Sequence, residues 1–194
     1  MAQSRPVLVV VDVQKGFEEP VWGIRNNPRA EEQMLRLIQA WRIKEYPIIH
    51  VQHASQNPDS PLHPAQPGFP FKDKFGPIED EYLVRKHVNS CFIGTELDTY
   101  LKANGYHTLV IIGLTTNHCV STTVRMAGNL GYLVYAVHDA TACFETVSYD
   151  GTHYDADTVH HLALASLHGE FAQVVSTQEV LDVVDALEKN SAIR

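Results

Sequence analysis

The sequence predicts an α/β fold in which helices cover both faces of a mainly parallel sheet. Short runs rich in valine and isoleucine recur along the chain, and such uninterrupted apolar runs are typical of strands buried on both faces. Longer stretches with apolar residues at helical spacing separate these runs, which is the order of β-α-β units. We therefore expect a three-layer α/β/α, Rossmann-like domain whose sheet has about six strands.

The expected strands are short apolar runs that end at polar or turn-forming residues. The first stops at Asp12, and the most apolar one stops at the polar run that begins with Thr115. In chain order the expected strands are Val7–Val11, Ile48–Gln52, Tyr82–Arg85, Thr108–Leu114, Leu133–His138 and Ala172–Ser176.

The expected helices are bounded by proline or glycine. Arg29–Glu45 follows Pro28, carries apolar residues at helical spacing and ends before Pro47. A glycine after three of the other helices supplies the left-handed residue that commonly ends a helix. These other helices are Thr95–Asn104, Cys119–Leu130, Asp155–His168 and Thr177–Glu188.

The chain shows no sign of division into separate units. Asn57–Pro77 holds six prolines and two glycines, which predicts an ordered but irregular surface loop rather than a linker. We find no repeat and no low-complexity tract. A length of 194 residues with 44% hydrophobic content suits one core, so we expect residues 1–194 to form a single domain.

Charge and composition exclude several classes of partner. The formal charge of -8 and the pI near 5.7 offer no basic patch for a phosphate backbone, so we expect neither nucleic acid nor an anionic membrane as a partner. The five apolar residues Val7–Val11 are too few for a secretory core or a membrane span. We expect a cytoplasmic protein that acts on a small molecule. Its three widely spaced cysteines, Cys91, Cys119 and Cys143, favour free thiols.

Several side chains with useful chemistry follow the expected strands. Ligands bind to open parallel sheets beyond the carboxyl ends of the strands, where the loops separate. Asp12 follows the first strand, Lys86 the third and Cys119 the fourth. The other candidates at strand ends are His53, Asp139 and Cys143.

Asp12, Lys86 and Cys119 form a working set for covalent catalysis. Cys119 is expected in the first turn of a helix, where unpaired amide groups stabilise a thiolate. Backbone N–H groups of Thr115 and Cys119 are placed to form an oxyanion hole. Asp12 ends an apolar strand, where a carboxylate is costly unless a cation such as Lys86 pairs with it. With Asp12 as base, Cys119 can attack an acyl carbon and form a thioester.

Each of these residues also has a simpler interpretation. A cysteine near a helix start, taken alone, more often serves packing than catalysis. Asp12 can cap a turn, and Lys86 can belong to a solvated charge cluster. Cys143 is the main rival nucleophile, but no helix start follows it closely. We expect Cys143 and Cys91 to be structural.

Four segments carry a family resemblance: VVVDVQKGF (Val9–Phe17), VRKHVNSCFIGTEL (Val84–Leu97), VIIGLTTNHCVSTTVRMAGNLGY (Val110–Tyr132) and VHDATACF (Val137–Phe144). In joint order and spacing they resemble the isochorismatase-like cysteine hydrolases. That superfamily includes nicotinamidases, carbamoylsarcosine amidohydrolases, ureidoacrylate hydrolases and streptothricin hydrolase-like proteins. The resemblance spans nearly the whole chain. It implies that Asp12, Lys86 and Cys119 form a catalytic triad and that a cis peptide bond joins Leu114 to Thr115.

Departures from the family patterns narrow the expected activity. Metal-binding nicotinamidases carry histidines after the second strand, but His50 and His53 are an odd number of residues apart. A regular strand points them to opposite faces, so we expect no metal. True isochorismatases lack the nucleophilic cysteine, so Cys119 argues against cleavage of a vinyl ether. The sequence looks closest to the streptothricin hydrolase-like and generic amidohydrolase branch.

Further residues are expected around the substrate. Phe17 and Trp22 follow Asp12 in the first loop, and His53 stands at a strand end, so all three are predicted to bind substrate. Gln14 is expected to bind the loop backbone.

Three other histidines are expected to lie away from the substrate. His118 is expected to face solvent or a neighbouring subunit, although it adjoins Cys119. His160 and His161 lie on a helix with an apolar face, and we expect both at the surface or at an interface.

The predicted function is hydrolysis of a C–N bond in a small amide, ureide or carbamoyl compound, without a cofactor. Two alternatives stay open: a redox-sensing thiol protein on the same fold and an isochorismatase-type vinyl ether hydrolase. Nucleotide binding is disfavoured because the first turn, DVQKGF, has no glycine-rich phosphate loop. By analogy with the family we expect a homo-oligomer, dimer or tetramer, with Tyr149–Tyr154 as a candidate to cross the interface.

Overall fold

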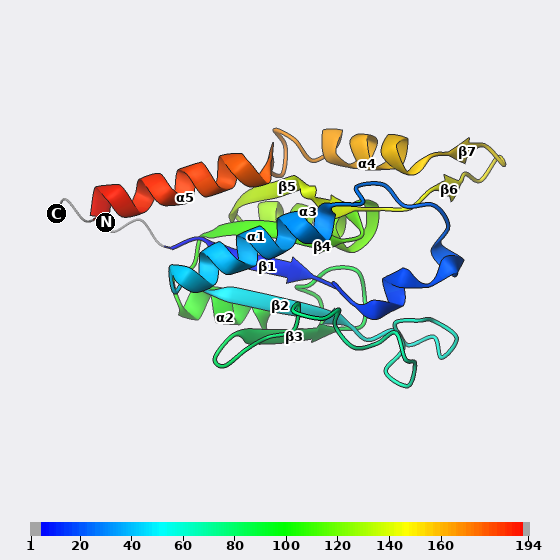
Figure 1. Cartoon of the computed structure of the whole chain (residues 1–194), viewed down its shortest axis with the longest axis horizontal. Coiled ribbons are helices and arrows are strands. Elements are labelled where there is room, and N and C mark those ends of the chain that lie inside the picture. The colour runs from blue at the N-terminus through cyan, green and yellow to red at the C-terminus, as the bar shows by residue number, and fades with distance from the viewer. Residues whose placement is uncertain (1–4, 192–194) are drawn as a thin grey trace.

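One parallel sheet forms the centre of the molecule. The structure, a computed structural model, describes the backbone of residues 5–191 and the side chains up to residue 186. The strands of the sheet are β1 (Val7–Val11), β2 (Ile48–His53), β3 (Tyr82–Lys86), β4 (Thr108–Leu114), β5 (Leu133–Ala142) and β8 (Gln173–Val175). They lie in the order β3-β2-β1-β4-β5-β8, and all neighbours are parallel (Figure 1). The expected parallel sheet is confirmed.

Helices cover both faces of this sheet. They are α1 (Ala30–Ile43), α2 (Leu97–Ala103), α3 (Ser121–Asn129), α4 (Ala156–Ala165) and α5 (Thr177–Ser191). Val7 and Val9 of β1 pack in one core cluster with α2 and α3. Leu8 and Val10 pack in a second cluster with α1 and α5, on the opposite face of the sheet (Figure 1). Both faces of β1 are therefore buried, which accounts for its unbroken apolar sequence, and the three-layer fold is confirmed.

The order of the strands creates a crevice beside β1. This strand pairs with β2 on one side and with β4 on the other, so the chain runs outward from β1 in one direction and later returns on its other side. Such a switch point leaves room for a ligand beyond the carboxyl ends of the strands. Figure 1 shows the segments after β1, β2 and β5 at this end of the sheet, on the right of the view.

A glycine permits close contact of the two strands that border the crevice. Gly113 of β4 pairs with Val11 of β1 and has a φ of 124°. A Cβ atom at position 113 would lie 2.0 Å from the backbone oxygen of Val11. Only glycine leaves this space open and adopts this backbone conformation.

Strand β5 is longer than the sequence predicts. It continues to Ala142 after a register shift against β4 between Ile111 and Gly113. Asp139 therefore lies inside the strand, where its Oδ1 accepts hydrogen bonds from the backbone N and the Oγ1 of Thr177, both at 2.8 Å. The interpretation of Asp139 as a strand-end residue is wrong, because this carboxylate instead binds the first turn of α5.

The expected helix from Cys119 begins differently. Residues Thr116–Val120 form one turn of π-helix, and α3 starts only at Ser121. The sequence also missed several short elements, because two- to four-residue segments show no periodicity. They are the 3-10 helices Lys15–Glu18 and Pro20–Trp22 and the hairpin strands β6 (Thr146–Val147) and β7 (His153–Tyr154). The ends of the other helices agree within three residues.

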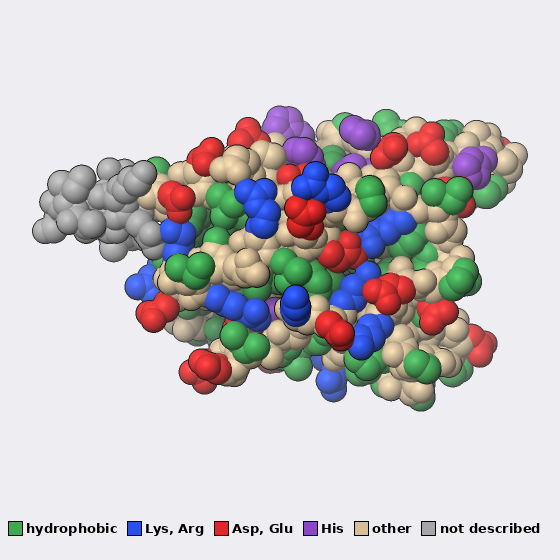
Figure 2. Space-filling view, in the orientation of Figure 1, with side chains coloured by type: hydrophobic (Ala, Val, Ile, Leu, Met, Phe, Trp, Pro, Cys, Tyr) green, Lys and Arg blue, Asp and Glu red, His purple; other side chains and the backbone are tan. Residues whose placement is uncertain are grey.

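The surface carries charges of both signs. Figure 2 shows acidic and basic side chains intermingled over the face that carries α1. None of the described helices is long and apolar enough to span a membrane.

Candidate active site

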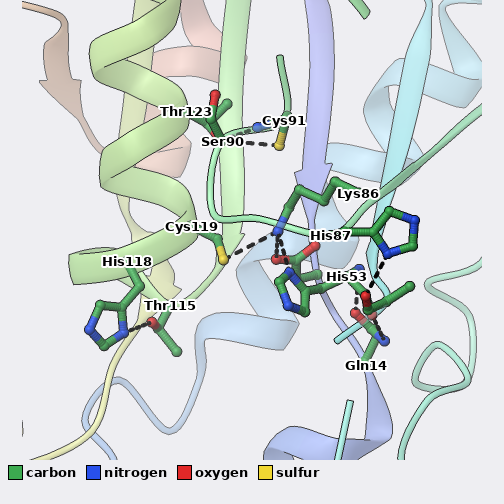
Figure 3. A network of polar contacts seen from close by, with 12 residues as sticks. Gln14, His53, Lys86, His87, Ser90, Cys91, Thr115, His118, Cys119 and Thr123 are labelled. Atoms are coloured by element: carbon green, nitrogen blue, oxygen red, sulfur yellow. Dashed lines mark hydrogen bonds and ion pairs between the residues drawn. The ribbon is translucent and has the colours of Figure 1, made fainter. Parts of the chain in front are cut away.

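Lys86 connects three strand ends of the crevice. This residue ends β3, pairs in register with His53 of β2, and extends its side chain past that strand. Its Nζ lies 2.6 Å from Oδ2 of Asp12. The same atom lies 3.2 Å from Sγ of Cys119 (Figure 3). The side chains of Lys86 and Asp12 are both fully buried. The structure thus brings together the three residues that the sequence analysis selected.

His53 completes the contacts of the Lys86 ammonium. Nζ lies 2.9 Å from Nδ1 of His53, so the three hydrogens of the ammonium have three acceptors, on Asp12, His53 and Cys119. Nδ1 of His53 accepts a hydrogen bond, which places the ring proton of the neutral form on Nε2. Burial lowers the pKa of His53, and the charge of Lys86 lowers it further. Lys86 is therefore held in one position by a carboxylate, a neutral imidazole and a sulfur.

Asp12 reaches Lys86 because the strand ends in an unusual conformation. Its φ is 53°, in the left-handed region that aspartate tolerates better than most residues. Val11 and Val13, two positions apart, pack in clusters on opposite faces of the sheet, which a regular strand does not allow. The break in alternation coincides with Asp12. Oδ1 of this carboxylate is buried and has no hydrogen-bond partner among the described residues.

Cys119 lies in the turn that follows β4. The peptide bond between Leu114 and Thr115 is cis, as the resemblance implied. The backbone oxygen of Thr115 accepts hydrogen bonds from the amides of His118 and Val120 at 3.1 and 3.2 Å, which closes the turn around the cysteine. Thr115 and Cys119 both line the same pocket, so the two amides expected to form an oxyanion hole belong to residues at this surface.

The environment of Cys119 keeps its thiol protonated. Burial raises the pKa of this thiol well above its usual range, and the Asp12 carboxylate raises it further, while Lys86 acts in the opposite direction. For Lys86, burial has the largest single effect and lowers the pKa, but the neighbouring acidic groups, Asp12 foremost, together outweigh burial and raise the pKa. Burial and Asp12 therefore oppose the expected stabilisation of a thiolate by a helix start, and they favour the neutral thiol. The neutral thiol lies beside the Lys86 ammonium and the Asp12 carboxylate, and the carboxylate can receive the thiol proton.

The same residue types raise the question of a metal. One ligand atom each of Asp12, His53 and Cys119 lies within 4.8 Å of the others. Nζ of Lys86 contacts all three side chains, so the ammonium takes the position that a cation would need. His50 is not part of this group, because its ring is buried between the Phe75 oxygen (2.7 Å) and Glu81 (2.8 Å). The donor set fits proton transfer better than metal binding.

A pocket of about 450 Å³ opens onto Cys119. This volume suits a small molecule. Phe17, Trp22 and His53, all predicted to bind substrate, are in its wall. The other lining residues are Val21, Ser60, Leu62, Asn89, Thr115, Asn117, His118, Phe144, Glu145 and Thr146.

Three aromatic rings form one wall of this pocket. The ring centroids of Phe17 and Trp22 are 5.2 Å apart, and that of Phe144 is 5.9 Å from Trp22 and 6.3 Å from Phe17. The indole N–H of Trp22 donates to the oxygen of Gly16 at 2.7 Å. The sequence analysis missed Phe144, although its place just after β5 was a signal that could have found it.

Gln14 fixes the first loop against the end of β2. Its side-chain amide donates to the oxygens of His53 (3.1 Å) and Phe69 (2.8 Å), and its Oε1 accepts from the amide of His53 (2.8 Å). The expected role of Gln14 in binding the loop backbone is confirmed. This buried amide holds β2 and the proline-rich loop beside the pocket.

The two other cysteines are enclosed in the core. Sγ of Cys91 lies 3.0 Å from Oγ1 of Thr123, and Sγ of Cys143 lies 3.3 Å from the oxygen of Ala156. Burial raises the pKa of each thiol to about 12. Both are fully buried, and neither lines the pocket described above. The geometry supports structural roles for both.

Comparison with known proteins identifies the family. The model of the isochorismatase domain matches residues 6–179. This chain belongs to the isochorismatase family. Members of the family are hydrolases, and the protein is accordingly an isochorismatase-family hydrolase.

Individual relatives agree with this family assignment. The isochorismatase family protein YrdC of Bacillus subtilis is 46% identical over 180 residues, which are 93% of this chain and 96% of YrdC. A streptothricin hydrolase of Streptomyces noursei is 31% identical over 71% of this chain and 50% of its own length. The crystal structure of a hydrolase of the isochorismatase family from Chromobacterium violaceum superimposes with a TM-score of 0.92, at 39% identity and 96% coverage of both chains.

One histidine of this isochorismatase-family chain lies where the sequence analysis did not expect it. His160 is 3% exposed, so its expected surface position is wrong, whereas His161 is exposed. Nδ1 of His160 lies 2.9 Å from Oγ1 of Thr116, in the turn that carries Cys119. Helix α4 contacts this turn as well as the sheet. The side of α4 that carries His160 is therefore buried against the turn. His118, in contrast, is exposed at the rim of the pocket, in agreement with the prediction that it faces solvent.

Burial of His160 makes the stability of the protein depend on pH. Burial lowers the pKa of His160 from 6.5 to about 4, so between these values the unfolded chain binds a proton more readily than the folded one. The corresponding stability is present above pH 6.5 and is lost as the pH falls towards 4. We expect His160→Asn to weaken this pH dependence, measured as the free energy of urea unfolding across that range. His161→Asn is the matched control, and an unchanged pH profile for His160→Asn would contradict the prediction.

Proposed function

We propose that the protein hydrolyses C–N bonds of small amides, ureides or carbamoyl compounds through a thioester on Cys119. The observation that carries this proposal is the position of Lys86 Nζ, which is hydrogen-bonded to both the Asp12 carboxylate and the Cys119 sulfur. Cys119 lines a pocket. Such an arrangement supplies a nucleophile, a base and a fixed positive charge in one buried place.

The first half of the reaction acylates the cysteine. Asp12 takes the thiol proton as Cys119 sulfur attacks the substrate carbonyl carbon. The electron pair of the carbonyl moves to its oxygen, where the backbone amides of Thr115 and Cys119 stabilise the charge. When the carbonyl re-forms, the C–N bond breaks and Asp12 returns the proton to the leaving nitrogen. Lys86 keeps its proton throughout and compensates the negative charge on sulfur or carboxylate.

The second half returns the enzyme to its initial state. Water enters the place left by the amine and gives a proton to Asp12 while its oxygen attacks the thioester. The C–S bond breaks, the acid or carbamic acid leaves, and Cys119 regains the proton. Since the resting thiol is protonated, each half-reaction begins and ends with the same charges on Asp12, Lys86 and Cys119.

The alternatives are less consistent with this site. Cleavage of a vinyl ether needs no nucleophilic thiol, so it leaves Cys119 without a role. A redox sensor needs an accessible thiol with a depressed pKa, whereas burial raises the pKa of Cys119 and leaves it 8% exposed. The sequence similarity to a streptothricin hydrolase supports a hydrolytic reaction.

The test is turnover of an amide panel combined with capture of the acyl-enzyme. We expect ammonia or amine release from at least one small amide, ureide or carbamoyl compound, and a protein mass increased by the acyl group on Cys119. Cys119→Ser should lower kcat/KM by at least about 1,000-fold, while Cys143→Ala retains turnover. Full activity in Cys119→Ser, or acylation at another residue, would exclude the proposed mechanism. Peroxide consumption by Cys119 without any amide turnover would instead favour the redox alternative.

A further inference from the structure

The wall of the pocket carries very little charge. Among the described residues that line it, Glu145 is the one with a charged side chain, and the others are aromatic, aliphatic, hydroxyl, amide or imidazole groups. Asp12 and Lys86 stand behind Cys119, fully buried and paired with each other. A substrate in this pocket therefore meets one negative charge at the wall and a neutral ion pair behind the nucleophile.

None of the described residues that line the pocket offers a positive charge to a substrate carboxylate. His53 accepts a hydrogen bond from Lys86 and is neutral. His118, the other lining imidazole, is exposed at the rim, but its ring is partly shielded from water by the surrounding residues, and this lowers its pKa. Arg25, which pairs with Phe144 through the backbone, directs both of its terminal nitrogens to Glu31, at 2.7 and 2.6 Å. A bound carboxylate would thus lose its water without gaining a cation.

The Glu145 carboxylate is fixed at the edge of the aromatic wall. Its Oε1 accepts a hydrogen bond from the amide of Ile24 at 2.9 Å, and its own amide donates to the Ile24 oxygen at 2.8 Å. These bonds join the segment that carries Trp22 to the segment that carries Phe144. His153, which is not among the residues that line the pocket, lies 2.9 Å from Oε2. The hydrogen bond from Ile24 and the contact with His153 lower the pKa of Glu145, so it is charged at neutral pH.

The aromatic wall favours flat or cationic groups. Phe144 is stacked against both other rings, with interplanar angles of 17° to Phe17 and 29° to Trp22. All three residues line the pocket, so together they give it an aromatic surface. Such a surface suits stacking of a planar group, and ring faces attract cations. The Glu145 carboxylate beside the rings also attracts cations.

We infer that this pocket selects amides that carry a planar apolar group and a positive charge, and that it discriminates against amides that carry a carboxylate. The inference rests on the proposed hydrolysis at Cys119 and specifies its substrate class. It excludes anionic substrates on the basis of charge, since Glu145 repels them and none of the described wall residues supplies a cation to bind them.

Two isosteric pairs of benzamides test the charge preference without a change of shape. The cation (3-carbamoylphenyl)trimethylammonium is compared with neutral 3-tert-butylbenzamide, and the anion 3-carbamoylbenzoate with neutral 3-nitrobenzamide. Binding to Cys119→Ala is measured by calorimetry at mildly alkaline pH, where ordinary histidines are uncharged. We expect the cation to bind about tenfold tighter than its isostere, and the anion about tenfold weaker than its own.

Glu145→Gln tests the source of the preference. This variant keeps an acceptor for the Ile24 amide but removes the charge, so the ratio of the two affinities in the cationic pair should fall to about threefold or less. Glu19→Gln is the matched control, because it removes an exposed charge from the loop of Trp22 without touching the pocket wall. It should keep the full ratio.

The outcomes separate this inference from the proposed function. Equal binding within both pairs, tighter binding of the anion, or no binding of any probe overturns the charge preference. Ammonia release by the unmodified protein reports on hydrolysis independently of these ratios. Binding in the expected order without ammonia release supports the charge preference and counts against hydrolysis of these amides. Ammonia release with equal affinities within each pair supports hydrolysis and overturns the charge preference.

Discussion

Replacing Lys86 with methionine is expected to abolish the proposed amide hydrolysis and to lower the free energy of unfolding by about 3–5 kcal/mol. Methionine fills a similar volume but leaves the Asp12 carboxylate buried without its cation. Oδ2 of Asp12 then loses its 2.6 Å partner, and Oδ1 has none among the described residues. The cost is that of a stranded buried charge, which far exceeds the value of an exposed ion pair.

Urea unfolding of three variants separates this cause from loss of packing. Asp12→Asn/Lys86→Met removes both charges, so it should recover a large part of the stability that Lys86→Met loses. Lys102→Met breaks the exposed pair with Asp98 (2.7 Å) and should cost less than about 1 kcal/mol. If the double variant is as unstable as Lys86→Met, the loss comes from packing and the stranded-charge explanation is wrong.

The placement of the catalytic candidates was predictable because a parallel sheet has one carboxyl edge. Asp12, Lys86 and Cys119 follow three different strands in the sequence, and the sheet order alone puts those strand ends within reach of one another. The sequence could not show how Lys86 spans the gap. It ends β3, two strands away from β1, and reaches Asp12 only because its long side chain passes His53 on β2.

Other features of the site depend on contacts that leave no pattern in one sequence. The conformation of Asp12 breaks the alternation of β1 at a single residue, which periodicity cannot reveal. The sequence of α4 predicts one buried face and places His160 outside it, but the helix also contacts the turn 116–120. Glu145 borders the exposed strand Thr146–Val147, which is too short to show a periodicity. Each case is set by tertiary contacts rather than by local preference.

Replacing Asp12 with asparagine is expected to make Cys119 react faster with an alkylating reagent and to abolish the proposed hydrolysis. The Asp12 charge raises the pKa of this thiol, whereas Lys86 lowers it. In Asp12→Asn the ammonium remains without its carboxylate, so the thiol pKa falls and Cys119 becomes the counter-ion of Lys86. Each unit of decrease gives tenfold more thiolate but lowers its nucleophilicity about threefold. We expect alkylation by iodoacetamide near neutral pH to become about tenfold faster, while turnover is lost.

Mass spectrometry of alkylated peptides gives this rate for each cysteine separately. The expected order for Cys119 is Asp12→Asn fastest, the unmodified protein next and Lys86→Met slowest, while Cys91 and Cys143 react equally slowly in all three. An Asp12→Asn variant that alkylates no faster than the unmodified protein would show that Asp12 does not control the thiol. A variant with more thiolate and no hydrolysis cannot lack a nucleophile, so the missing step must be delivery of a proton to the leaving nitrogen, which assigns Asp12 to proton transfer rather than to holding Lys86 in place.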